Sequence, residues 1–206
     1  MDAEEDSGAG SEIAAFRQQL KRDNEALYLH LGEFVCLYAN VETACHSTFH
    51  FQSGLSERVA KAMVGGMRLS DLIGVLSRVI ELSNSLAQFF KEDFKACVTQ
   101  FDHITALRNR LIHRGAQARY GEYVSTNSLT AKTRESVDIL KFRLDDLKAA
   151  SDDCSRIAFR IHLVNFGGDH GQPSDWERSL YAPWRYKPVQ PKKTNVASTT
   201  KRRSNN

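Results

Sequence analysis

The stretch that most clearly predicts the fold is FKACVTQFDHITALRNRLIH, residues 94–113. At about 100° of rotation per residue, its apolar residues fall on one stripe along a predicted helix of residues 86–113. The stripe comprises Phe94, Cys97, Phe101, Ile104, Leu111 and Ile112. Such a stripe is wide enough to face a hydrophobic core, and Gly115 supplies a stop signal just beyond it. The pattern therefore predicts a helical domain built around this helix.

A charged residue interrupts the stripe, because Arg108 falls only about 20° from Phe101 by the same count. A buried, unpaired guanidinium costs several kcal/mol. Arg108 must then have a carboxylate partner, or the stripe must open at this point into a cleft or a subunit seam. Glu42, on the inner face of an earlier predicted helix, is the candidate partner.

Polar residues flank Arg108 on both sides. Asn109 and His113 are four residues apart and share one edge of the stripe. Asp102 lies earlier on the same edge, where it is a candidate to tune the pKa of His113. Arg110 and Arg114, also four apart, point to the opposite side.

Apolar periodicity and stop signals elsewhere predict further helices. Their ranges are residues 12–21, 24–51, 57–64, 72–82 and 134–166. Between 115 and 133 the chain is rich in Gly, Ser, Thr and Asn. Residues 122–125 there fit either a short strand or an extended loop, and the loop is favoured. The predicted fold class is all-α, an up-down bundle of four to five helices.

The two ends of the chain differ in charge. Of 206 residues 41% are hydrophobic and the net charge is +3, yet residues 1–12 carry only acids and residues 185–206 only bases. We predict a disordered acidic tail at 1–10, the helical domain at 11–167 and a disordered basic tail at 187–206. Between them, residues 168–186 are rich in Trp and Tyr. Such a segment docks either on the domain itself or on a partner.

The cysteine and histidine patterns predict no metal site and no cofactor. Cys36, Cys45, Cys97 and Cys154 show no Cys-x-x-Cys pair and suggest small core residues in a reducing compartment. His46 and His50 are four apart but lack a third ligand, so we expect them at the surface. Neither a membrane-length apolar run nor a signal-peptide pattern is present. The expected location is the cytoplasm.

The six residues Arg108-Asn109-Arg110-Leu111-Ile112-His113 resemble the Arg-polar-x-x-x-His signature of the HEPN superfamily. The resemblance covers residues 24–167. It implies an all-α bundle that dimerises so that two motifs meet across a two-fold axis. It also implies a metal-independent endoribonuclease of a prokaryotic defence, toxin or stress system, with a cognate inhibitor protein as a further partner.

Chemistry supports the same interpretation of the motif. Cleavage by the ribose 2′-hydroxyl needs proton transfer, which His113 would supply, and positive charge at the phosphate, which Arg108 would supply. Asn109 would orient one or the other. Additional contacts to RNA are expected from basic residues beside the motif and in the tail, namely Arg110, Arg114, Lys192, Lys193, Lys201, Arg202 and Arg203. The alternative is a non-catalytic module in which the motif binds RNA, supports oligomerisation or only stabilises the bundle.

Overall fold

The computed structural model describes residues 6–119, 122–166 and 179–188. Its elements are α1 (Asp6–Ser53), α2 (Glu57–Val64), α3 (Leu69–Leu82), α4 (Gln88–Arg114), β1 (Gln117–Arg119), β2 (Glu122–Thr126), β3 (Ile139–Phe142) and α5 (Leu144–Leu163). Two short 3₁₀ helices, η1 (Arg134–Ser136) and η2 (Val164–Phe166), complete the order. The protein is mostly helical, which agrees with the predicted helical bundle, and a small three-stranded sheet that was not predicted is added to it.

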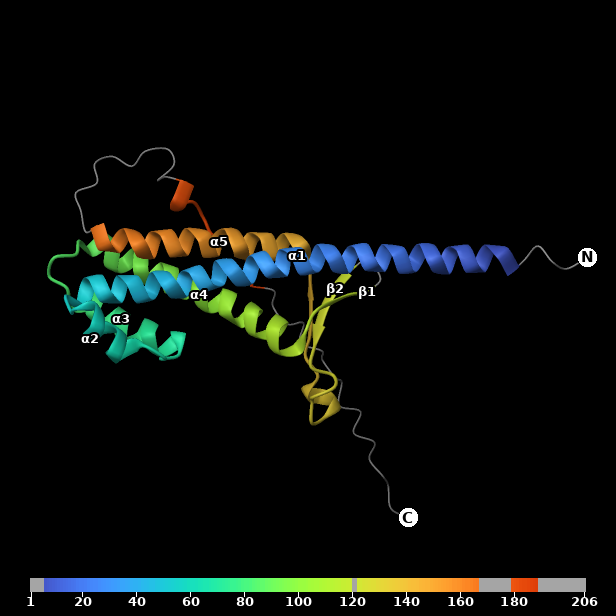
Figure 1. Ribbon diagram of the computed structural model, residues 1–206, viewed down its shortest axis with the longest axis horizontal. Coiled ribbons are helices and arrows are strands. Elements are labelled where there is room, and N and C mark those ends of the chain that lie inside the picture. The colour runs from blue at the N-terminus through green and yellow to red at the C-terminus, as the bar shows by residue number, and fades with distance from the viewer. Residues whose placement is uncertain (1–5, 120–121, 167–178, 189–206) are drawn as a thin grey trace, which may run out of the picture.

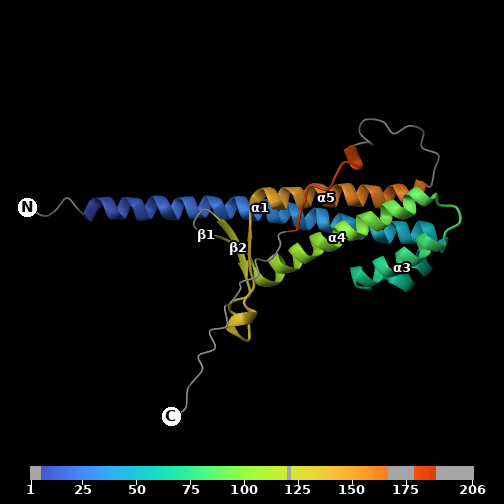
Figure 2. The same cartoon turned by 180° about the vertical axis from the view of Figure 1, so that it is seen from behind.

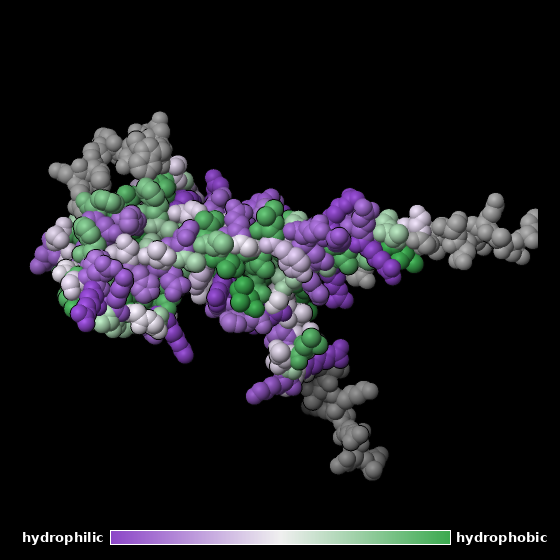
Figure 3. Space-filling view, in the orientation of Figure 1, coloured by the Kyte–Doolittle hydropathy of each residue, from purple (hydrophilic) through white to green (hydrophobic). Residues whose placement is uncertain are grey.

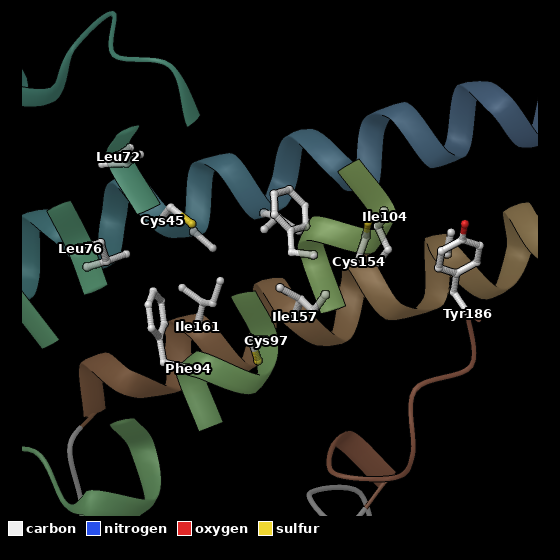
Figure 4. Close-up of a cluster of buried hydrophobic side chains, with 14 of the residues drawn as sticks. Cys45, Leu72, Leu76, Phe94, Cys97, Ile104, Cys154, Ile157, Ile161 and Tyr186 are labelled. Carbon is white, nitrogen blue, oxygen red and sulfur yellow. The ribbon is translucent and has the colours of Figure 1, made fainter. Parts of the chain in front are cut away.

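The bundle consists of α1, α4 and α5, with α2 and α3 covering one end (Figure 1). Along α1, Leu27, Phe34 and Val41 recur every seven residues and are fully buried. They meet the buried positions of α5, among them Leu147, Ile157 and Ile161. Figure 4 shows how side chains from α1, α3, α4 and α5 converge in this core. Among the described helices, none is long and apolar enough to cross a membrane.

α1 is one continuous helix of 48 residues, and the predicted break near residue 23 is wrong. Asp23 and Asn24 look like N-cap residues, but their side chains have other partners. Asp23 accepts a hydrogen bond from Gln19 at 2.9 Å, and Asn24 accepts one from the backbone of Ala118 in β1 at 3.1 Å. The helix also starts at Asp6, inside the stretch 1–10 predicted to be disordered; residues 1–5 lie outside the described part. Its N-terminal portion projects beyond the bundle (Figures 1 and 2).

A three-stranded antiparallel sheet, in the order β1-β2-β3, follows α4 and packs on α1 and α4. Its register pairs Ala118 with Tyr123 and Tyr123 with Phe142. The expected loop at 122–125 is instead strand β2, and the predicted helix of 134–166 begins only at Leu144. Burial alternates along β3, where Leu140 and Phe142 are buried and their neighbours exposed. A sheet with one covered face imposes this period of two.

The buried face of α4 is rotated away from the predicted stripe. Besides Phe101 and Ile104, it includes Gln100 and Leu107, so its centre lies nearer Ile104 than Phe101. Ile112, predicted to lie on the stripe, is 42% exposed. Arg108 is accordingly half-buried at the edge of the core rather than enclosed in it.

Candidate functional site

Arg108 lies in the seam between α4 and α1, over the ring of Tyr38. The centre of its guanidinium is 5.5 Å from the ring centroid, within the range of a cation–π contact. Its Nη1 donates a hydrogen bond to Oδ1 of Asn109 at 3.1 Å. Because Asn109 lies between Arg108 and His113 around the helix, this hydrogen bond turns the guanidinium toward the edge that carries His113.

Tyr38 forms a rigid support for the guanidinium. Its ring stacks on Phe101 with the centroids 4.7 Å apart, and its hydroxyl shares a 3.1 Å hydrogen bond with Thr105. Burial raises the pKa of Tyr38, while the Thr105 hydrogen bond and the charge of Arg108 offset part of that rise. The phenol is therefore neutral at physiological pH and presents its ring face to the cation. Nothing in the sequence pattern singled out Tyr38, which lies 70 positions before Arg108.

The predicted ion pair between Arg108 and Glu42 is wrong. In the described part of the chain, no carboxylate lies within 4.0 Å of the Arg108 guanidinium. The rotation of α4 leaves Arg108 partly in solvent, so it does not require a buried counter-charge. Glu42 is half-buried and acts only at longer range, where its charge helps to raise the pKa of Cys45 and Tyr38.

His113 and Asn109 are exposed one turn apart at the end of α4. Asp102 is also exposed, but it lies eleven residues before His113, or about 16 Å along the helix axis. Asp102 is therefore too far along the helix to contact His113 directly, as the prediction required. The structure thus brings Arg108 and Asn109 together, leaves His113 accessible beside them, and separates Asp102 from the group.

Hydrophobic side chains flank the Arg108 contact on both helices. Val35 lies three residues before Tyr38 on α1, and Ile112 lies four residues after Arg108 on α4; both are more than a third exposed. Figure 3 shows hydrophobic surface over the middle of the molecule, where α1 runs beside α4. The motif is therefore bordered by apolar surface, not surrounded by charge.

Arg110 and Arg114, predicted to bind RNA, both contact the carboxylate that directly precedes β3. Both contact Oδ2 of Asp138, at 3.4 Å and 2.5 Å, and all three side chains are about a quarter exposed. Ser125 of β2 also donates to the carbonyl oxygen of Arg110 at 3.1 Å, which ties the sheet to the last turns of α4. These two arginines hold the sheet against α4, and their charge is shared with one carboxylate.

A second polar group lies between α4 and α5, and the sequence did not point to it. Arg160 of α5 forms a bidentate ion pair with Asp93 of α4, through Nε at 3.1 Å and through Nη2. Both side chains are less than a tenth exposed. Burial alone would lower the pKa of Arg160, but the hydrogen bonds and charge of Asp93 hold it above its ordinary value. The guanidinium of Arg160 therefore keeps its charge in the interior.

The aromatic segment docks beside this ion pair, on the domain itself. We call residues 179–188 the strap; in Figure 2 it runs, in orange-red, across α5 toward α4. Its Tyr186 is buried in the core near Ile104 and Cys154 (Figure 4). Residues 167–178, with Trp176, and residues 189–206, with Lys192, Lys193, Lys201, Arg202 and Arg203, lie outside the described part.

Three of the four cysteines lie in the core as predicted, and of the two histidines expected at the surface only His50 is fully exposed. Cys45, Cys97 and Cys154 are buried free thiols, and burial raises the pKa of each to about 12. Cys36 is exposed because it faces away from the bundle on α1. His50 is exposed and His46 half-buried. No cluster of three metal-binding side chains occurs within residues 6–119, 122–166 and 179–188.

The fold and site define a helical bundle with a small antiparallel sheet and a basic motif at the end of its central helix. No family model, curated protein or solved structure matches the chain.

Proposed function

We propose that this chain is a metal-independent endoribonuclease of the HEPN type. The observation that carries the proposal is the environment of Arg108. A neutral amide and an aromatic ring hold this guanidinium, whereas Arg110 and Arg114 share the carboxylate of Asp138. Arg108 therefore keeps its full charge and its free N–H donors for a phosphate group, to which a guanidinium binds with charge-assisted hydrogen bonds.

The reaction uses His113 and Arg108 on one phosphodiester. His113 takes the proton of the ribose 2′-hydroxyl, and the 2′-oxygen forms a bond to phosphorus. The bond from phosphorus to the 5′-oxygen breaks, and that oxygen takes up a proton. Arg108 binds the non-bridging oxygens and stabilises the charge of the phosphorane, while Asn109 keeps the guanidinium turned toward them. The products are a 2′,3′-cyclic phosphate and a 5′-hydroxyl.

A homodimer supplies the second proton-transfer group. Each chain offers one histidine at the motif, whereas the reaction needs a base and an acid. The exposed side chains of Val35 and Ile112 beside the motif support association through this face, because apolar surface next to a polar site favours contact with another chain. The histidine of the second copy then protonates the leaving 5′-oxygen. On the HEPN resemblance we assign the activity to a prokaryotic defence, toxin or stress system with a cognate inhibitor protein.

The test is cleavage of a structured RNA by the purified chain in EDTA. We expect fragments that end in a 2′,3′-cyclic phosphate, and we expect His113→Ala to abolish them. His103→Ala is the matched control, because His103 is exposed on the same helix but lies ten residues before His113. A requirement for added divalent metal, or full activity of His113→Ala, would contradict the proposal. RNA binding without cleavage would identify a binding module instead.

A further inference from the structure

Side chains of α4 and α5 donate hydrogen bonds to several carbonyl oxygens of the strap. Arg156 donates to the carbonyl oxygens of Leu180 at 2.9 Å and Pro183 at 3.2 Å, and also to that of Ala182. Gln100 donates to the carbonyl oxygen of Tyr186 at 3.0 Å. These hydrogen bonds require the strap backbone in its observed conformation, which includes a turn from Ser179 to Ala182, and they do not depend on the chain's connection to α5.

Asp153 holds the strap from the other side of its backbone. Its carboxylate accepts the backbone N–H of Arg185 at 3.1 Å and that of Tyr186 at 2.9 Å. It also accepts hydrogen bonds from Gln100 at 2.9 Å and Arg156 at 3.2 Å, and it has no exposed surface. A buried carboxylate that loses two of four donors is strongly disfavoured, so an empty site is costly.

Two aromatic side chains of the strap provide its specificity. Trp184 lies over the guanidinium groups of Arg156 at 5.0 Å and Arg160 at 4.5 Å. Tyr186 is only 4% exposed. The site therefore recognises a short segment with the pattern Trp-x-Tyr, by aromatic contacts together with main-chain hydrogen bonds.

The strap itself buries little apolar surface. Of its ten residues, Tyr186 alone is classed as buried, and Ser179, Ala182, Pro183 and Arg185 are exposed. The strap is therefore held by hydrogen bonds and a few aromatic contacts and has no apolar core of its own. Because its site is costly to leave empty, release of the strap is favoured only where an equivalent segment takes its place.

A second copy of the chain carries that equivalent segment. Twelve residues connect η2 to the strap, and a chain of this length can span about 40 Å. A released strap can therefore reach the same site on a neighbouring copy, where it makes the same contacts. Exchange of an identical element between copies needs no new interface, which makes it a low-cost route to association.

We propose that the surface formed by Gln100, Asp153, Arg156 and Arg160 is a docking site for a short aromatic peptide, and that its partner in trans is the strap of a second copy of this chain. The site lies between α4 and α5, whereas Arg108 contacts α1, and the inference does not rest on the nuclease proposal.

The first experiment measures binding of a fluorescent peptide of the strap sequence, SLYAPWRYKP, to the full-length Trp184→Ala chain. We expect saturable binding, and binding about tenfold or more weaker to the wild-type chain, because its own strap competes at an effective concentration on the order of millimolar. A peptide with alanine in place of both Trp184 and Tyr186 is the matched control and should not bind. Absence of binding to a folded Trp184→Ala chain would overturn the docking site. If that variant does not fold, Arg185→Pro, which removes one strap N–H at an exposed position, replaces it.

The second experiment tests the partner. Full-length Trp184→Ala, labelled at Cys36 with a donor dye, is mixed with full-length Arg156→Ala, labelled at Cys36 with an acceptor. The Trp184→Ala chain has an intact docking site and a weakened strap. The Arg156→Ala chain has a weakened docking site and an intact strap. We expect energy transfer that rises with concentration and disappears with excess unlabelled peptide. Energy transfer that the peptide does not remove, or none at all, would overturn the second copy as the partner.

Discussion

Arg160 and Asp93 are 67 positions apart in the sequence, yet they form a bidentate ion pair in the packed interior between α4 and α5. Arg160 also stacks on Tyr181 and Trp184 of the strap. One arginine thus joins three segments that are distant in the chain. Because both charges are withdrawn from water, the removal of one partner leaves the other charge buried and uncompensated.

Breaking this pair should therefore destabilise the protein strongly. Arg160→Met should lower the free energy of unfolding by about 3–5 kcal/mol, since it leaves Asp93 charged and buried without its partner. The double variant Arg160→Met with Asp93→Leu should recover much of that loss, because no uncompensated charge remains. Urea denaturation of the wild type, both single variants and the double variant measures this. Equal losses in the single and double variants would contradict the account.

Helical periodicity predicted the helices well, because one buried face repeats at the helical period in each. It failed where tertiary contacts override local pattern. Leu140, Leu144 and Leu147 continue the spacing of a helix, but Leu140 belongs to a strand because its neighbour β2 pairs with it. The sequence contains no comparable sign of that pairing, which depends on a partner strand about 15 residues earlier.

Helical periodicity is limited in a similar way for charged residues in the packed interior. The helical count that singled out Arg108 also places Asp153 and Arg160 within about 60° of Ile157 on α5. The signal for the interior ion pair was therefore present but unused. The count cannot tell which residue of another helix faces such a charge, so it suggested Glu42 for Arg108 and missed Asp93 for Arg160.

The thiols should differ sharply in reactivity. Burial raises the pKa of Cys45, Cys97 and Cys154 to about 12, so almost no thiolate is present at neutral pH and reagents cannot reach it. A thiol reagent at pH 7 should modify Cys36 quickly and the other three only after unfolding. Mass spectrometry of the native protein should show one label per chain. Cys36→Ser should show none.

The side chain of Asn24 should stabilise the edge of the sheet. Asn24→Ala leaves the N–H of Ala118 without its acceptor, which should cost about 1 kcal/mol, since water can partly replace the amide at this half-buried position. The effect on local opening of strand β1 should be clearer than the effect on the free energy of unfolding. Hydrogen exchange at Ala118 should accelerate, whereas Asn40→Ala, at an exposed position of the same helix, should leave it unchanged.

The most discriminating prediction compares Arg108 with Arg114. Because Arg108 contacts a ring and an amide at the edge of the core, Arg108→Ala should cost no more than about 1 kcal/mol of folding free energy, as expected for a partly exposed cation–π contact. It should nevertheless abolish cleavage, since the phosphate ligand is lost. Arg114→Ala removes an ion pair with Asp138 and should cost a similar amount, but it should leave cleavage largely intact. Denaturation curves and cleavage assays on the two variants measure these effects side by side. A large loss of stability in Arg108→Ala would mean that a counter-charge holds this arginine after all, and equal loss of cleavage in both variants would mean that the end of α4 acts as a general basic surface without a specific phosphate ligand.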